Sequence, residues 1–140
     1  MNWTLEVVIV PVSDVNAAIT FYREGLGFNL DLDLDHGSGG SYRVVQLTPP
    51  GSGCSIQLGH GITTMPPGSL GGLQLVVPDL MTAHAELTAR GVNVSRILVF
   101  DERGHQRPYR EGDDLNNVGF MFFKDPDGNS WAVQQISDRP

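Results

Sequence analysis

The chain has 140 residues, of which 40% are hydrophobic and 18% charged, so we expect one soluble globular domain with a hydrophobic core. Sixteen acidic against nine basic residues give a net charge of −7, which argues against nucleic acid or an anionic membrane as a partner. The apolar runs are too short to cross a membrane. No basic stretch precedes the first apolar run, as it would in a signal peptide. The single cysteine, Cys54, cannot form an internal disulfide. We therefore expect a cytoplasmic protein without a signal peptide.

The first half of the chain predicts a strand, a helix and three further strands. The opening run is mostly apolar and β-branched, as in buried strands. Ser13 or Asp14 can cap the helix that follows, and Gly25 or Gly27 can end it. The predicted elements are a strand at 5–12, a helix at 13–27 and strands at 28–35, 42–48 and 54–59.

The strand at 28–35 alternates apolar and polar side chains without a break, which predicts one buried face. The apolar set is Phe28, Leu30, Leu32 and Leu34, and the polar set is Asn29, Asp31, Asp33 and Asp35. The three aspartates could cradle a cationic ligand, but a solvated face that resists aggregation is the favoured interpretation.

The second half repeats this pattern after a connector at 60–69 that is rich in glycine and proline. The two helix starts, Asp14 and Asp79, lie 65 positions apart, which indicates two copies of one unit. The predicted elements are a strand at 70–77, a helix at 78–91 and strands at 92–100, 118–123 and 130–136. We therefore predict an α+β fold of two tandem βαβββ modules, about 5–59 and 70–136, in a single domain spanning 1–140.

The polar segment at 101–118 is long for an ordinary connection, which favours a lid or a binding loop. Arg107, Tyr109 and Arg110 could reach from it over a cavity mouth. A plain mobile loop is the alternative.

The last predicted hairpin turns at residues 125–128, "DPDG", which is typical of a type I turn followed by a left-handed glycine. A three-residue loop of this kind fixes the pairing of the strands on either side. The predicted cross-strand pairs are Asp125 with Asn129, Phe122 with Ala132 and Phe120 with Gln134.

The paired modules, together with "PVSDVNAAITFYREGLGF" and "DPDGNSWAVQQI", resemble the vicinal oxygen chelate superfamily over residues 5–136. That group includes glyoxalase I, ring-cleaving dioxygenases, fosfomycin-resistance enzymes and bleomycin-resistance proteins. The resemblance implies that each sheet curls into a U, that the concave faces enclose the active site, and that the protein is a homodimer.

Metal-binding members place His, Gln or Glu at four cavity positions, which the resemblance carries onto Val7, Gln57, Gly72 and Ala132. Only Gln57 could donate an oxygen, whereas a divalent site needs three or four protein ligands. We therefore expect no metal and no other cofactor, and none of the glyoxalase, dioxygenase or thiol-transferase chemistries.

The predicted cavity combines apolar side chains, two aromatic rings and three neutral amides, a composition suited to a small, largely uncharged organic molecule. Its residues are Val7, Ile9, Gln57, Gly72, Gln74, Phe120, Phe122, Ala132 and Gln134. His60 is added because it directly follows the cavity strand, and Tyr109 because its loop could place it over the cavity mouth. Tyr42 is added because it could reach the cavity of a partner subunit. We predict no catalytic residue, because nothing in the set resembles an activated nucleophile or a strong general base.

Several other residues have ordinary structural interpretations. His84 falls on the apolar stripe of its helix and is expected to pack there, and Trp131 is expected to pack away from the cavity. Cys54 is expected to be a buried structural thiol, and His36 and His105 to be solvated loop residues.

The favoured function is a metal-independent binding protein that holds or sequesters a hydrophobic, aromatic compound such as an antibiotic or another natural product. The alternative is a metal-independent lyase, isomerase or hydrolase in which His60, Tyr109 or a loop acid transfers a proton. A glyoxalase-type enzyme with displaced metal ligands is the least favoured.

Overall fold

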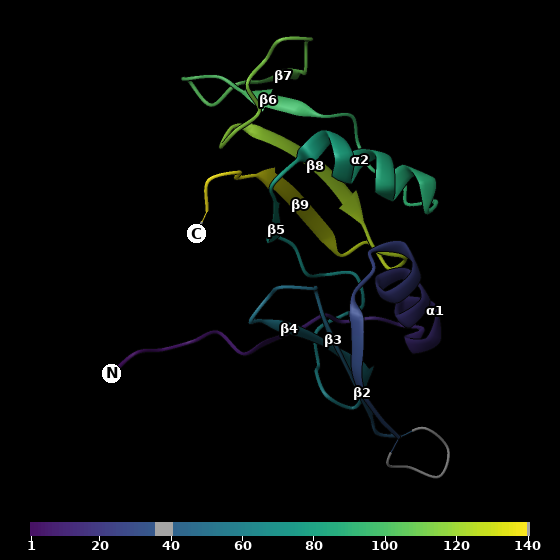
Figure 1. Cartoon of the computed structure of the whole chain (residues 1–140). Coiled ribbons are helices and arrows are strands. Elements are labelled where there is room, and N and C mark those ends of the chain that lie inside the picture. The colour runs from purple at the N-terminus through teal and green to yellow at the C-terminus, as the bar shows by residue number, and fades with distance from the viewer. Residues whose placement is uncertain (36–40, 140) are drawn as a thin grey trace. The chain divides into compact units, whose positions relative to one another are not determined.

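The computed structural model describes residues 1–35 and 41–139, so His36 lies outside the described residues. The chain divides into two compact units, each with its own sheet (Figure 1). The first unit comprises Met1–Leu70 and Asp125–Asn129, and the second comprises Gly71–Lys124 and Ser130–Pro140. Two mixed sheets with few helices confirm the predicted α+β fold.

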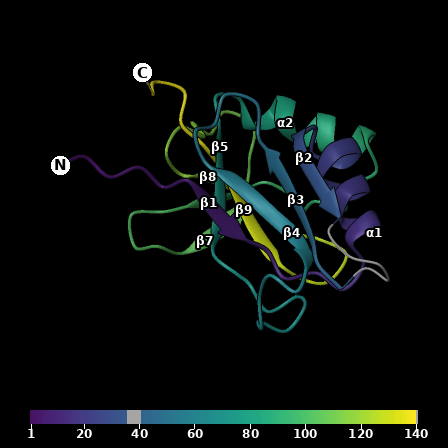
Figure 2. The same cartoon turned by 90° about the horizontal axis from the view of Figure 1, so that it is seen from below.

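The first unit follows the predicted order of strand, helix and three strands. Its sheet has the order β1-β4-β3-β2, in which β1 runs parallel to β4 and the other neighbours are antiparallel (Figure 2). The Asp14 carboxylate accepts a hydrogen bond of 3.0 Å from the Ala17 amide and so caps the helix, as predicted. The elements are β1 (Val7–Ile9), α1 (Val15–Thr20), the π-helical turn η1 (Phe21–Gly25), β2 (Asn29–Asp35), β3 (Arg43–Thr48) and β4 (Ser55–His60).

The leucines of β2 do not form the buried face that their alternation predicts. The pairing of β2 with β3 shifts at Asp31, because Leu30 lies opposite Leu47 but Leu32 lies opposite Gln46. One extra residue in a strand turns every later side chain to the opposite face. Leu32 and Leu34 are consequently 37% and 42% exposed, on the face opposite the buried Leu47.

The second unit has the sheet order β5-β9-β8-β6-β7, with β5 parallel to β9 and the other neighbours antiparallel. The Asp79 carboxylate caps its helix by accepting from the Thr82 amide, and this bond holds the pKa of Asp79 below its ordinary value. The elements are β5 (Leu73–Val77), α2 (Leu80–Ala89), β6 (Leu98–Phe100), β7 (Gln106–Pro108), β8 (Gly119–Lys124) and β9 (Ser130–Gln135).

The third strand of the second unit is shorter than predicted, and the polar segment after it is partly ordered as a strand. Only residues 98–100 of the predicted strand 92–100 pair in the sheet. Residues 106–108 then return as β7 and extend the sheet by one strand. The polar segment is therefore not a simple lid.

The last hairpin has the predicted register. Phe122 lies opposite Ala132 and Phe120 opposite Gln134. Gly128 adopts a φ of 102°, and its amide donates to the Asp125 carbonyl oxygen at 3.0 Å. The local turn chemistry therefore fixes which side chains share a face of this sheet.

Helix α2 covers one face of the second sheet. The Leu80 amide donates to the Gln135 side chain at 3.0 Å, which places the helix over the odd-numbered residues of β9. Phe123 and Trp131 stack on this face with ring centroids 5.9 Å apart, and Trp131 is 4% exposed. The predicted core role of Trp131 is confirmed.

The turn of the last hairpin is built into the first unit. Asp125, which is 5% exposed, accepts hydrogen bonds from the Tyr22 hydroxyl at 2.8 Å and from the Asn129 side chain at 2.7 Å. Its second oxygen accepts from the backbone amides of residues 127–129. Asn129 is fully buried, and its amide group donates to the Pro11 carbonyl oxygen at 2.8 Å. These bonds compensate for burying a charge.

Replacing Tyr22 with Phe is expected to lower the free energy of unfolding by about 1.5–3 kcal/mol, the usual worth of a hydrogen bond to a charged group. Urea unfolding followed by circular dichroism measures this change. The matched control is Tyr109→Phe, because Tyr109 is only half-buried, whereas Tyr22 is buried. Equal stability of the two variants would show that the Asp125 cluster contributes little.

Replacing Gly68 with Ala is expected to destabilise the first unit by more than the strain of its backbone alone. Gly68 has a φ of 80°, and an added Cβ would lie 2.1 Å from the Asp127 carbonyl oxygen. Gly51 has a φ of 82° with open space around it. Gly51→Ala should therefore lower the free energy of unfolding only by the backbone strain of about 1–2 kcal/mol, with no added clash. Equal losses of unfolding free energy in the two variants would contradict the predicted clash.

Candidate functional site

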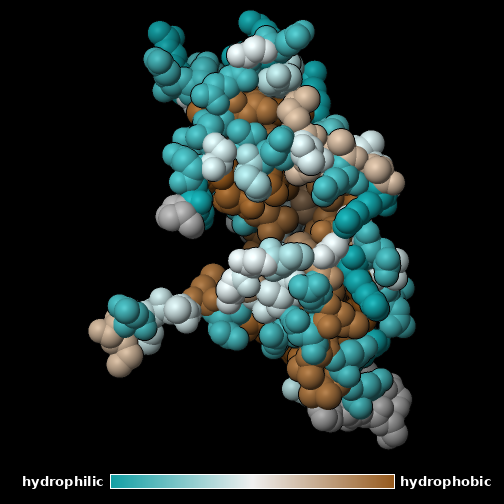
Figure 3. Space-filling view, in the orientation of Figure 1, coloured by the Kyte–Doolittle hydropathy of each residue, from teal (hydrophilic) through white to brown (hydrophobic). Residues whose placement is uncertain are grey.

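The second sheet exposes a row of phenylalanines on the face opposite α2. The Phe100 and Phe120 rings meet edge to face with centroids 4.9 Å apart, and Phe120 and Phe122 lie nearly parallel at 6.4 Å. All three are half-buried. We call this surface the aromatic face, and it comprises Gln74, Leu98, Phe100, Phe120, Phe122, Ala132 and Gln134. Hydrophobic side chains reach the surface in this part of the molecule (Figure 3).

A chain of amides borders these rings. The Gln134 side chain donates to the Asn117 carbonyl oxygen at 2.8 Å, and the Gln74 side chain donates to the Gln134 oxygen at 2.6 Å. A backbone carbonyl oxygen can only accept a hydrogen bond, so the NH2 group of Gln134 must face Asn117. The side-chain oxygen of Gln134 then faces Gln74, whose NH2 group is the donor. The Gln74 oxygen is therefore left at the end of the chain, where it can accept a further hydrogen bond.

Asn117 holds one end of this amide chain in an uncommon backbone conformation. Its φ of 67° is the one positive value among the described residues other than glycine, and its amide donates to the Gln135 carbonyl oxygen at 2.8 Å. Asparagine tolerates this conformation better than most residues. Sequence reasoning missed Asn117 and the aromatic-face residue Phe100, although "NN" before a strand is a turn signal.

The first unit has a related but less aromatic face. The Gln57 side chain donates to the Gln46 oxygen at 3.2 Å, and Gln57 lies opposite both Gln46 and Ile9 in the sheet. Val7 lies on the same face, two residues before Ile9. The structure thus brings together Val7, Ile9 and Gln57, as predicted from the sequence, and adds Gln46.

Of the two further predicted contacts of the first unit, His60 does not share this surface. It is exposed at the end of β4, opposite Arg43, and three positions after Gln57 its side chain points to the other face of the sheet. Tyr42, which is 42% exposed, precedes β3. Cys54 is half-buried rather than buried as expected, because it precedes β4 instead of lying within it.

The aspartates of β2 do not form a free cationic cradle. Asp33 accepts from both the Nη2 and Nε atoms of Arg43, at 2.8 and 3.0 Å, and this pair lowers the pKa of Asp33 and raises that of Arg43. Arg43 also donates to the Asn16 side chain at 2.9 Å. Asp31 accepts from the Thr48 hydroxyl.

Tyr109 lies apart from the aromatic face. It follows β7, and its amide donates to the Ile97 carbonyl oxygen at 3.0 Å, beside α2. His84 of α2 lies nearby, with its Nε2 atom 3.2 Å from the Ser95 carbonyl oxygen. His84 is half-buried on its helix, in agreement with its expected packing role.

Metal-ligating residues do not converge in the part of the chain that the structure describes. Within residues 1–35 and 41–139, no three His, Cys, Asp or Glu side chains come together as a possible metal site. Of the four positions carried over by resemblance, only Gln57 has a side-chain oxygen that could ligate a metal. Its side-chain NH2 group donates a hydrogen bond to the Gln46 oxygen.

Residues 4–133 match the sequence model of the glyoxalase/bleomycin resistance protein/dioxygenase superfamily, which covers almost the whole chain. The chain belongs to this superfamily. The predicted family and its fold are thereby confirmed. A comparison with curated proteins found no match. No helix among the described residues is both long and apolar enough to cross a membrane.

Solved structures of this superfamily include close matches to the chain. TnmS3, an antibiotic binding protein from Streptomyces sp. CB03234, is 33% identical, with a TM-score of 0.71 over 97% of this chain and 98% of its own. A glyoxalase/bleomycin resistance protein from the same organism is also 33% identical, with a TM-score of 0.69 over 94% and 100%. A superfamily member from Sphaerobacter thermophilus DSM 20745 is 26% identical, with a TM-score of 0.72 over 96% and 98%.

The segment that follows β7 is fixed by an ion pair whose pKa can be measured. Asp113 accepts from two Arg107 nitrogens, at 2.7 and 2.9 Å, and from the Arg110 amide at 2.8 Å. The Arg107 bonds, followed by the Arg110 bond, lower the pKa of Asp113 to about 2 from 3.8. The stabilising contribution is therefore fully present above about pH 4 and is lost as the pH falls through about 2.

Carboxyl-detected NMR should find the Asp113 pKa near 2, and Arg107→Ala should return it towards 3.8. The control is Arg103→Ala, which removes an arginine of the same polar segment that does not act on the pKa of Asp113. An Asp113 pKa that is unchanged in Arg107→Ala would contradict the assigned ion pair.

Proposed function

We propose that this protein binds a hydrophobic, aromatic small molecule, such as an antibiotic or another natural product, on its aromatic face and without a metal ion. The observation that carries the proposal is the half-buried row of Phe100, Phe120 and Phe122 beside a hydrogen-bonded chain of amides. The similarity to an antibiotic binding protein at 33% identity supports the same class of ligand.

The aromatic face can supply both affinity and orientation. A planar ligand would cover exposed ring surface, which releases water and allows stacking. Ala132 lies opposite Phe122 and next to Gln74, so its short side chain leaves room beside the ring. The Gln74 oxygen could then accept a hydrogen bond from the ligand, which would fix the ligand's orientation.

We propose the face of the first unit, taken by itself, as a second ligand-binding surface, because it combines apolar side chains with paired amides in the same way. Val7, Ile9 and Gln57 are its central residues, Tyr42 precedes β3 beside it, and His60 lies on the other face of β4. Replacing Gln57 with Ala tests its participation.

We also propose a cytoplasmic homodimer. The first unit exposes large hydrophobic side chains that a second copy could cover, namely Trp3, Leu5, Leu32, Leu34 and Tyr42. Light scattering after size-exclusion chromatography would give the mass directly. A monomeric mass at micromolar concentration would refute the dimer.

A metal-independent lyase, isomerase or hydrolase has less support. Tyr109 lies beside α2 rather than at the aromatic face, and His60 is exposed at the end of a strand. Recovery of the bound compound unchanged after long incubation would favour binding, whereas its conversion would favour the enzyme.

Replacing Phe122 with Ala is expected to weaken binding of an aromatic ligand by about 1–3 kcal/mol, because a stacking ring is lost. A panel of aromatic antibiotics, screened by fluorescence quenching and then by calorimetry, provides the ligand and its Kd.

The control is Met65→Ala, which removes an exposed hydrophobic side chain that belongs to neither proposed binding surface. A Kd that changes equally in both variants, or in neither, would rule out the aromatic face as the binding site.

A further inference from the structure

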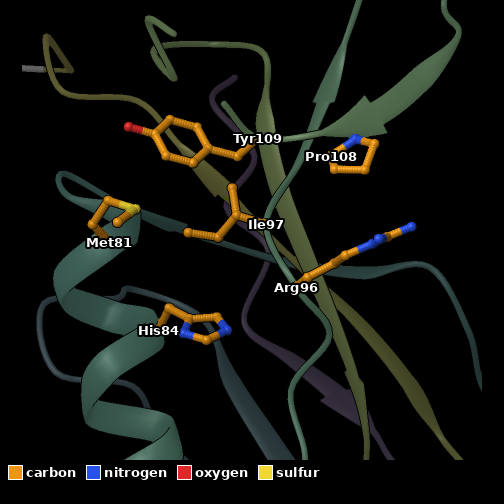
Figure 4. A pocket seen from close by; sticks show the side chains of 6 residues that line it. All are labelled: Met81, His84, Arg96, Ile97, Pro108 and Tyr109. Atoms are coloured by element: carbon orange, nitrogen blue, oxygen red, sulfur yellow. The ribbon is translucent and has the colours of Figure 1, made fainter. Parts of the chain in front are cut away.

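The second unit has a pocket on the other side of its sheet from the aromatic face. It has a volume of about 260 Å³ and lies between α2 and the residues that flank β6 and β7 (Figure 4). Met81 and His84 line it from the helix, one turn apart. The other lining residues are Arg96, Ile97, Pro108 and Tyr109.

The pocket exists because the sheet is wider than the helix that covers it. Helix α2 packs over β8 and β9, whereas β6 and β7 extend the sheet beyond them. The bond from the Tyr109 amide to the Ile97 carbonyl oxygen holds Tyr109 at this edge. The Arg107–Asp113 pair fixes the backbone on either side of Tyr109, so the rim of the pocket is held in place without a ligand.

The surface of the pocket is mostly apolar and partly aromatic. The Met81 thioether, the Ile97 side chain and the Tyr109 ring surround the central space in Figure 4, with the His84 ring below them. The Arg96 guanidinium points away from this space, so only its stem contributes. Thioether and aromatic groups favour contact with aromatic rings.

The polar atoms of His84 do not face the central space of the pocket. Its Nε2 atom lies 3.2 Å from the Ser95 carbonyl oxygen, which can only accept a hydrogen bond, so Nε2 carries the proton of the neutral ring. Figure 4 shows Nδ1 on the side of the ring away from Met81, Ile97 and Tyr109, so His84 turns a carbon edge of its ring towards the pocket.

We propose that this pocket binds a one- or two-ring aromatic compound of the indole type, held by apolar and thioether–aromatic contacts with Met81, Ile97 and Tyr109. The volume supports this size, because a cavity of about 150 Å³ holds benzene and drug-sized ligands need about 300 Å³ or more. The site is separate from the aromatic face and does not depend on the function proposed for that face.

Titration of the ¹⁵N-labelled protein with indole tests the site by NMR. Saturable shifts are expected for the backbone amides of Met81, His84, Ile97 and Tyr109. Met81→Trp should weaken indole binding at least tenfold, because the added ring occupies the pocket. The matched control, Glu86→Trp, adds the same ring at an exposed position of the same helix and should leave the Kd unchanged.

Comparison of indole with benzofuran tests whether the contacts are apolar. Benzofuran has nearly the same shape but no N–H group, so the wild-type protein should bind the two compounds with nearly equal affinity, and a preference for indole of tenfold or more would contradict the proposed contacts. Indole shifts that are confined to the aromatic face and lost in Phe122→Ala would overturn the proposal. It would also be overturned by a lack of saturation at millimolar indole, or by equal effects of Met81→Trp and Glu86→Trp.

Discussion

The buried carboxylate of Asp125 is the interaction on which the rest of the first unit depends. Five donors surround it, and they come from the turn itself, from Tyr22 of η1 and from Asn129. Asn129 extends the network to the Pro11 carbonyl oxygen and the Leu70 amide, so segments that are distant in the sequence share one set of bonds. Because buried polar groups are costly when unpaired, these partners stabilise the fold only as a complete set.

The same turn also determines the surface that we assign to ligand binding. A one-residue change in the register of the last hairpin would turn Phe120 and Phe122 towards α2 and bring Met121 and Phe123 to the opposite face. The core stacking of Phe123 on Trp131 and the ligand-facing row of phenylalanines are thus two results of one register. Stability and the composition of the site are coupled through this short segment.

Turn chemistry made part of this arrangement predictable from the sequence, whereas the irregular elements were not. "DPDG" fixes a register because proline and glycine restrict the backbone, and the two capping aspartates mark the helix starts. The bulge at Asp31 has no such marker, since leucine and aspartate continue to alternate through it. Strand β7 and the backbone of Asn117 depend on tertiary contacts within a polar segment, and local propensity does not encode these contacts.

The neutrality of the aromatic face has a consequence for how a ligand would be chosen. The protein carries a net charge of −7, yet the residues that make up this face are phenylalanine rings, aliphatic groups and amides without charge, and the one charged residue of β8, Lys124, lies at the end of the strand. Exposed charges are screened within about 8–10 Å at physiological ionic strength, so those elsewhere on the protein act only weakly on a molecule bound here. Affinity for a neutral molecule at this face would then change little with added salt, whereas a charged molecule of like shape would bind more weakly, because its charge would lose water without gaining a partner.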